Sequence, residues 1–235
     1  MWSGPRNLST ALMRSFENRK DTLVWDEPLY AYFLNETKKK HPLYKKIISS
    51  YETDIIKLIN NISSKNIDEK IHYQKHMTHH ILDKTPLEWL KNGFNCFLIR
   101  DPKDVILSYI KKNQLNDSND LGFPMQIKLF NIVKSYGENP IVINANDLSS
   151  NPERVLKKLC EKIKISFNKD MLNWPKGKRD TDGLWGDVWY NNVNSSCSFE
   201  KFTKDNSKIP EIHKNIFSDC KKIYNELNKH SILNE

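Results

Sequence analysis

Three short apolar runs constrain the fold of this chain more than any other feature. They are "TLVW" at 22–25, "CFLI" at 96–99 and "PIVIN" at 140–144. Each lacks the polar alternation of a half-exposed strand, and each is followed by polar residues and then by helix-like sequence. This order is typical of buried parallel strands covered on both faces. The sequence therefore predicts an α/β fold with a central parallel sheet flanked by helices, whose ligands bind beyond the carboxyl ends of the strands.

The opening stretch "MWSGPRNLSTALMRSF" fits the same order if Met1 and Trp2 end a very short strand. The glycine permits a tight turn into a helix, and such a loop aims backbone N–H groups and the positive helix end at one point. Arg6 adds a planar fork suited to phosphate or sulfate, and the Ser9 and Thr10 hydroxyls add donors. The alternative is an ordinary loop with Ser9 as N-cap. A strict Walker motif is absent because Leu8 stands where its second glycine would be.

The stretch "LIRDPKDVILSYIKK" runs from a buried strand directly into a helix. Asp101 is predicted to cap this helix, Pro102 to be its first residue, and Asp104 to complete a capping box. Arg100 then lies at the strand end and Ser108 about two turns along the helix, roughly 10 Å of axial rise from the cap. The two could hold one phosphate between them. Otherwise Arg100 is a surface ion-pair partner and Ser108 an indifferent helix residue.

The overall composition limits where such a protein works and what it binds. With 235 residues, the chain is expected to form a single domain, 1–235. Lys and Arg exceed Asp and Glu by 37 to 29, and the net charge of +8 favours an anionic ligand. The four cysteines form no C-x-x-C pair, and no apolar run approaches the ~20 residues of a membrane span. We therefore expect a cytoplasmic protein, with the Lys- and Asn-rich stretches 35–42 and 60–70 on solvated faces.

Three segments in the same order resemble the sulfotransferase family. "LIRDPKDVILSY" looks like the segment in which an arginine and a serine eight residues apart hold the 3′-phosphate of 3′-phosphoadenosine 5′-phosphosulfate (PAPS), here Arg100 and Ser108. "NANDLSSNPERVLKKLCEKIKI" is similar to the family's later strand and helix, with Ser150 or Asn151 as the predicted cap. "SGPRNLSTAL" resembles the loop for the 5′-phosphosulfate, which would be bound by Gly4, Pro5, Arg6, Asn7, Leu8, Ser9 and Thr10.

The resemblance covers residues 1–166 as a core and implies a P-loop NTPase-like three-layer fold. It also implies transfer of a sulfuryl group from PAPS to a hydroxyl or amine, with adenosine 3′,5′-bisphosphate as the second product. Arg6 would stabilise charge in the transition state, by analogy with phosphoryl transfer. Lys75 would contact the leaving oxygen, and no metal is required.

Two residues are candidates for the base that accepts the proton of the acceptor. "YQKHM" resembles the Lys-x-His segment of cytosolic sulfotransferases, which would give the role to His76, while "WDEPLY" resembles a segment of carbohydrate sulfotransferases, which would give it to Glu27. Glu27 directly follows a predicted strand, whereas His76 has the better intrinsic pKa near neutrality. Each could instead be purely structural. If residues 72–79 were helical, His72, His76 and His79 could also share a face and bind a transition metal.

The last part of the chain, 167–235, is predicted to hold a loop that covers the cofactor and a final helix over 212–227 that serves as scaffold. "WPKGKRDTDGLWGDVWYNNV" loosely resembles the family's C-terminal loop, and Lys178 and Arg179 would contact the 3′-phosphate. A basic cluster is also typical of a solvated face, and aromatic residues are typical of a core.

We therefore expect a PAPS-dependent sulfotransferase that acts on a small soluble acceptor and binds neither nucleic acid nor membrane. A P-loop small-molecule kinase is the nearest alternative, because "CFLIRD" also looks like a strand that ends in a magnesium-binding aspartate. The absence of Gly-Lys-Ser/Thr argues against it. A non-catalytic nucleotide- or nucleic-acid-binding relative is the second alternative, suggested by the net charge and by aromatic residues beside lysines.

Overall fold

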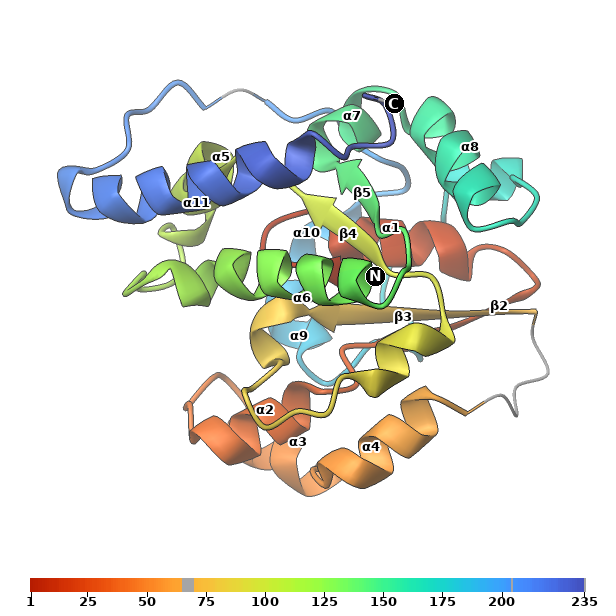
Figure 1. Cartoon of the computed structure of the whole chain (residues 1–235), viewed down its shortest axis with the longest axis horizontal. Coiled ribbons are helices and arrows are strands. Elements are labelled where there is room, and N and C mark those ends of the chain that lie inside the picture. Colours follow the sequence, from red (N-terminus) through yellow and green to blue (C-terminus); the bar gives the residue numbers. More distant parts are fainter. Residues whose placement is uncertain (65–69, 204, 235) are drawn as a thin grey trace.

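The structure, a computed structural model, describes residues 1–64, 70–203 and 205–234. Its centre is a five-stranded sheet in the order β2-β3-β1-β4-β5, and every neighbouring pair is parallel (Figure 1). All five carboxyl ends therefore face one edge of the sheet. The strands are β1 (Trp2–Ser3), β2 (Thr22–Asp26), β3 (Ile71–Met77), β4 (Cys96–Ile99) and β5 (Ile141–Asn144).

Strand β3 is absent from the sequence-based prediction. Its sequence, "IHYQKHM", is too polar to be recognised as an apolar run, yet it lies inside the sheet between β2 and β1. The helical spacing proposed for His72, His76 and His79 is therefore wrong, because His72 and His76 lie on an extended strand and His79 lies beyond its end. Among the described residues, no cluster of three or more potential ligands could hold a metal ion.

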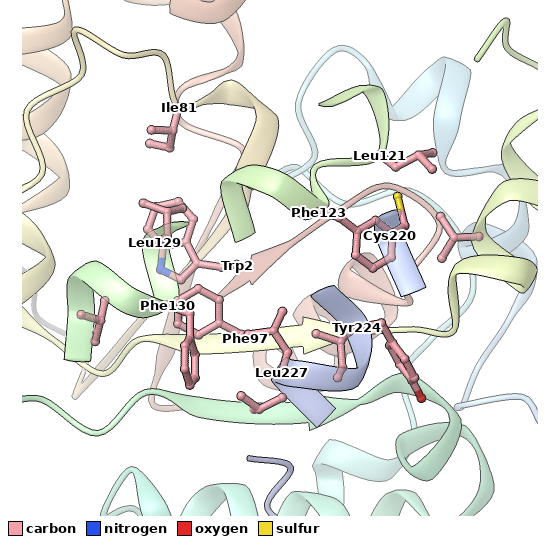
Figure 2. Packing of buried hydrophobic residues seen from close by; sticks show 14 of the residues in the cluster. Trp2, Ile81, Phe97, Leu121, Phe123, Leu129, Phe130, Cys220, Tyr224 and Leu227 are labelled. Carbon is pink, nitrogen blue, oxygen red and sulfur yellow. The ribbon is translucent and has the colours of Figure 1, made fainter. Parts of the chain in front are cut away.

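Helices cover both faces of the sheet, which confirms the predicted three-layer α/β fold. One hydrophobic cluster joins Trp2, Phe97 and Val142 of the sheet to α5 (Pro102–Tyr109), α6 (Phe123–Ser135) and α11 (Lys214–Asn228); Figure 2 shows Phe97 and Phe130 within it. The opposite cluster joins Leu98 and Ile143 to α1 (Ser9–Glu17), α7 (Ala145–Ser150) and α8 (Pro152–Lys162). Alternate residues of β4 thus point to opposite faces, as the pleat requires.

A third group of elements packs beside the β2 and β3 side of the sheet. It comprises α2 (Tyr30–Thr37), α3 (Tyr44–Ser50) and α4 (Ile55–Ile62), drawn in orange in Figure 1. Tyr30 and Ile47 share a small core there with Trp185 and Tyr190 of the late segment, which includes α9 (Gly186–Trp189) and α10 (Asn191–Ser195). Short 3-10 turns span Thr78–His80, Glu88–Asn92, Ser118–Leu121, Lys169–Leu172 and Glu211–His213.

The final helix is part of the core, as its predicted scaffold role requires. Cys220, Tyr224 and Leu227 of α11 are buried in the cluster of Figure 2, and Ile232 donates its backbone N–H to the Val142 carbonyl at 3.0 Å. Lys38 to Lys40 are exposed, whereas most of the polar stretch 60–70 lies at 65–69, outside the described residues. All four cysteines are free, and no described helix is long and apolar enough to cross a membrane.

Two of the three predicted helix caps form, but the capping box predicted for Asp104 does not. The Asp101 carboxylate accepts from Lys103 N at the start of α5 and not from Asp104 N, and Asn151 accepts from Arg154 N at the start of α8. Ser9, by contrast, is the first residue of α1 and not its N-cap. The cap is Leu8, which has no side-chain oxygen to offer the helix.

Candidate active site

The loop between β1 and α1 is strained where the sequence departs from a Walker motif. Leu8 has φ 67° and Arg6 has φ 65°, both in the left-handed region that glycine adopts freely and other residues adopt at a cost. A Cβ at Gly4 would lie 2.2 Å from the Leu121 carbonyl oxygen, so this position requires glycine. Strained backbone of this kind is typical of ligand-binding loops.

The rest of the loop lies against the carboxyl edge of the sheet. Asn7 is buried and donates from Nδ2 to the Leu98 carbonyl, while its Oδ1 has no hydrogen-bond partner in the described part of the chain. Pro5 is half-buried, Ser9 is buried, and Thr10 is half-buried in the first turn of α1. Because the first N–H groups of a helix have no intrahelical partner, this turn can donate to an anion.

The structure brings Arg6, Arg100 and Ser108 together. Arg6 Nε donates to Ser108 Oγ at 2.9 Å, and Arg100 Nη1 donates to the Arg6 carbonyl oxygen at 2.8 Å. The serine of α5 and the arginine after β4 thus meet through the β1–α1 loop and not directly. The three predicted anion ligands form one group at the carboxyl edge.

The charge of this group is poorly balanced by acidic residues. The ion pair of Arg100 with Asp104 spans 4.0 Å, longer than a hydrogen bond, and Arg100 Nε is buried without a hydrogen-bond partner in the described part of the chain. Burial lowers the pKa of Arg6. The pKa of Arg100 is lowered by burial and also by repulsion from Arg6. Both guanidiniums stay charged, so the site favours a multiply charged anion.

The residues predicted to cover the 3′-phosphate site are not the ones that lie there in the structure. Phe202 lies over Arg100, with the guanidinium carbon 3.6 Å from the ring centroid. Lys178 pairs instead with Asp187, and Arg179 lies 3.7 Å from Glu17 at the far end of α1. The structure therefore does not bring Lys178 and Arg179 together with Arg100, and the 3′-phosphate contact expected of them remains a prediction that this geometry does not favour.

A second polar group lies at the carboxyl ends of β2 and β3. Lys75 is 1% exposed, and its Nζ donates to Asp26 at 2.9 Å, to Glu27 at 2.6 Å and to the Tyr190 hydroxyl at 2.5 Å. An ammonium has three N–H donors, and here all three are used. Lys75 is thus occupied in holding the two carboxylates, which disfavours the predicted contact with a leaving oxygen.

Glu27 itself is held in an unusual conformation. It follows β2 directly with φ 43°, and its second carboxylate oxygen lies 4.0 Å from Nδ1 of the buried His80. Burial raises the pKa of Glu27, attraction to Lys75 opposes this, and repulsion from Asp26 adds to it, leaving the pKa raised. Burial also opposes the charge on Lys75, but Asp26 and Glu27 outweigh burial and raise its pKa. A carboxylate with a raised pKa at the carboxyl edge of the sheet is the kind of group that general bases are drawn from, so Glu27 stays a candidate.

His76, the other candidate base, lies elsewhere. It follows Lys75 on β3, so its side chain points to the opposite face of the sheet. Its ring stacks on Trp2 with centroids 4.6 Å apart, and Nε2 lies 3.2 Å from Gln74 Oε1. Burial holds the pKa of His76 well below its usual range. The structure brings Lys75, but not His76, together with Glu27.

A small cavity adjoins Glu27. Its volume is about 70 Å³, and its walls include Trp25, Leu58, Tyr51 and Trp185. The acidic residues Asp26, Glu27 and Glu52 also line it, and among the described residues no lysine or arginine does, so anionic groups are disfavoured there.

His79, which is half-buried with an inaccessible Nδ1, predicts a loss of stability in acid. Burial lowers the pKa of His79 to about 3, below the ordinary value of 6.5. Between these values the unfolded chain binds the proton and the folded chain does not, so stability falls as the pH falls. The cost for this residue between pH 7 and pH 5 is up to about 2 kcal/mol. Urea unfolding of His79→Asn at both pH values should show a correspondingly smaller difference than the parent protein, and an unchanged difference would contradict a neutral His79.

The comparisons with known proteins agree with this fold. The family model for the sulfotransferase domain matches residues 1–228, and the chain belongs to that family. The sulfotransferase domain of the Synechococcus PCC 7002 olefin synthase shares the fold with a TM-score of 0.60 at 15% identity, covering 95% of this chain and 92% of that domain.

Two Arabidopsis thaliana proteins are similar in sequence. They are named branched-chain-amino-acid aminotransferase-like proteins 1 and 2, and each is 33% identical over 229 residues. The match covers 97% of this chain and 41% of each relative, so the chain spans about two fifths of their length.

Four residues of the site were not found from the sequence. Asp26 immediately precedes Glu27, and a pair of acidic residues after a strand is a usable signal. His80 belongs to the histidine-rich stretch 72–80, whose composition indicates metal binding and not a carboxylate neighbour. Tyr190 and Phe202 lie more than 100 residues from the groups they contact, and nothing local to them indicates those contacts.

Proposed function

We propose that the protein transfers a sulfuryl group from PAPS to a hydroxyl or amine of a small soluble acceptor. The observation that carries this proposal is the convergence of Arg6, Arg100 and Ser108 beside a strained helix-start loop, on the sheet edge that also bears Glu27. Two guanidiniums and a hydroxyl suit a donor that carries several anionic groups. Family membership supports the transferase class.

The chain's own residues have separate roles in this proposal. The β1–α1 loop and Arg6 bind the 5′-phosphosulfate and stabilise charge that develops on it, while Arg100 and Ser108 hold the 3′-phosphate. Glu27 takes the proton of the acceptor as the acceptor oxygen or nitrogen bonds to sulfur. The bond from sulfur to the bridging oxygen breaks, and its electron pair leaves with adenosine 3′,5′-bisphosphate. Charge stabilisation by arginine and backbone N–H groups supports a reaction that needs no metal.

The acceptor is expected to be uncharged or cationic at its reacting end. The cavity at Glu27, about 70 Å³, has room for a small reacting group only, and its acidic residues favour a group that is uncharged or cationic. The test is to incubate the full chain with PAPS and a panel of alcohols, phenols, amines and sugars, with and without a chelator, and to detect sulfated products by mass spectrometry. A sulfated product that forms in the presence of the chelator supports the proposal. Phosphorylated product with ATP and magnesium, and none with PAPS, would instead support the kinase alternative.

Arg100→Ala should weaken binding of adenosine 3′,5′-bisphosphate about 10- to 100-fold. The variant removes charge-assisted hydrogen bonds to the 3′-phosphate, each worth about 1.5–3 kcal/mol. Binding of adenosine 5′-phosphosulfate, which lacks that phosphate, should barely change. The matched control is Lys103→Ala, which removes another cation close by, from the first turn of α5. Equal losses for the two nucleotides would mean that Arg100 does not bind the 3′-phosphate.

A further inference from the structure

The two carboxylates at the end of β2 are chemically unequal. Asp26 accepts from Lys75 Nζ at 2.9 Å, from the Tyr190 hydroxyl at 2.7 Å, from Trp185 Nε1 at 2.9 Å and from Gly183 N at 3.2 Å. Four donors thus surround the carboxylate of Asp26, a residue that is 3% exposed. Hydrogen bonds of this kind favour the charged form.

Glu27 has fewer partners. Its Oε1 accepts from Lys75 at 2.6 Å, and the Tyr190 hydroxyl lies 3.3 Å from the same atom. A phenol has one proton to donate, and the shorter contact of Tyr190 is to Asp26. Glu27 is therefore the carboxylate whose charge is less well stabilised, and the pair with Lys75 carries a net charge of one negative unit, enough to take up one proton.

We propose that Tyr190 is a positioning residue that keeps Asp26 charged and so makes Glu27 the carboxylate that takes the acceptor proton. This inference rests on the proposed function, in which Glu27 is the base. When the acceptor proton reaches a Glu27 carboxylate oxygen, the Asp26–Glu27–Lys75 group becomes neutral overall. The proton then leaves to water after the sulfated product departs.

The segment that carries Tyr190 also links the two halves of the site. Buried Arg14 of α1 pairs with Asp182 at 2.6 Å, and the next residue, Gly183, donates to Asp26. Helix α1 begins at the anion-binding loop, so one late segment is fixed both to that helix and to the strand that ends at the base. Residues 182 and 183 thus contact both the helix that starts at the anion-binding loop and the strand that ends at Glu27.

The titratable groups around Glu27 come from several elements, and each affects its charge. Lys75 on β3 favours the carboxylate, while Asp26 on β2 opposes it. His80 is neutral, because burial holds its pKa well below its usual range. The phenol of Tyr30 on α2 is also neutral, because burial and the charge of Glu27 raise its pKa. The remaining neighbours are Tyr190, and Glu52 across the cavity.

The experiment is a pH titration of the side-chain carboxyls by ¹³C NMR in the full chain labelled at glutamate and aspartate. Glu27→Gln identifies the Glu27 signal by its loss. Tyr190→Phe is expected to lower the pKa of Glu27, because Asp26 loses its hydroxyl donor and then competes with Glu27 for the one proton that the pair takes up. Tyr73→Phe is the matched control, since it removes a buried hydroxyl that has no hydrogen-bond partner in the described part of the chain, two residues before Lys75 on the same face of β3. It should leave the Glu27 titration unchanged.

A kinetic readout separates positioning from a structural role. Release of adenosine 3′,5′-bisphosphate from PAPS, with water as the acceptor, should fall about threefold in Tyr190→Phe on the plateau of the pH profile, because Glu27 is then a weaker base, while the acidic limb should move to lower pH. A uniform loss at every pH, or a Glu27 pKa equal to that of Tyr73→Phe, would overturn the proposal. Should Tyr190→Phe fold poorly, Trp185→Phe removes another donor to Asp26 and should shift Glu27 in the same direction.

The proposal and the proposed function fail in different ways. Calorimetry with adenosine 3′,5′-bisphosphate is run on the parent protein and on each variant. If the parent protein does not bind the nucleotide, the proposed function is rejected, whichever of Asp26 and Glu27 takes the proton. Normal binding and turnover with an unshifted Glu27 would reject only the role of Tyr190.

Discussion

Glu27→Gln is expected to lower the rate of sulfuryl transfer by about 10²- to 10⁴-fold, the usual contribution of a general base. Glutamine has the same size and can keep an acceptor for Lys75, but it cannot take a proton at neutral pH. Binding of adenosine 3′,5′-bisphosphate should stay unchanged, because the nucleotide group at Arg100 is formed by other elements. The measurement is turnover of PAPS with the best acceptor from the panel, beside calorimetry of nucleotide binding.

Two variants serve as controls for this result. Glu153→Gln changes a partly exposed glutamate on α8 that lies outside this cavity, and it should leave turnover nearly intact. His76→Gln tests the second candidate base, and the stacking of His76 on Trp2 predicts that it keeps turnover. Loss of activity in His76→Gln with normal folding, together with retention in Glu27→Gln, would reverse the assignment.

Lys75→Met should lower the free energy of unfolding by about 3–5 kcal/mol, the range found when one partner of a buried ion pair is removed. The variant leaves Asp26 and Glu27 buried side by side without their cation. For a chain of this length the loss corresponds to a fall in Tm on the order of 10 °C. Urea unfolding and thermal melts at neutral pH measure it.

The matched control for this variant is Lys158→Met on α8. Lys158 pairs with Glu161 at 3.2 Å on the surface, where ion pairs contribute little, so its stability should barely change. Adding Asp26→Asn to Lys75→Met should recover part of the loss, because one buried charge is removed with its partner. Equal stabilities for Lys75→Met and Lys158→Met would show that the buried group is not held together by charge.

The fold could be predicted from local sequence wherever a strand is an apolar run, although the run at 22–25 proves to be the edge strand β2, with Leu23 exposed, and not a strand buried on both faces. The runs at 96–99 and 140–144 face apolar helices on both sides of the sheet, so their composition reveals them. Strand β3 also lies inside the sheet, but Lys75 is compensated by partners up to 115 residues away. No local pattern can show that a lysine in mid-strand will be paired with Asp26 and Glu27 and hydrogen-bonded to Tyr190.

The candidate site also has a part that the sequence predicts and a part that it does not. Arg6, Arg100 and Ser108 follow strands or begin helices, so their place at the carboxyl edge follows from the order of elements. The position of the residues that cover the site does not follow from that order, because strands and helices no longer alternate beyond residue 166. Phe202 lies over Arg100 where lysine and arginine were expected. Leu8 also shows that a residue can hold the left-handed conformation that a motif assigns to glycine.

The measurement that tests this account most directly is calorimetric titration of the purified protein with adenosine 3′,5′-bisphosphate, beside ATP with magnesium and a short oligonucleotide. The account predicts selective binding of the bisphosphate, with one site per chain and no need for magnesium. Preference for ATP with magnesium, or salt-dependent binding of the oligonucleotide without selectivity for the bisphosphate, would contradict it and leave Arg100 and Ser108 without a role in PAPS recognition.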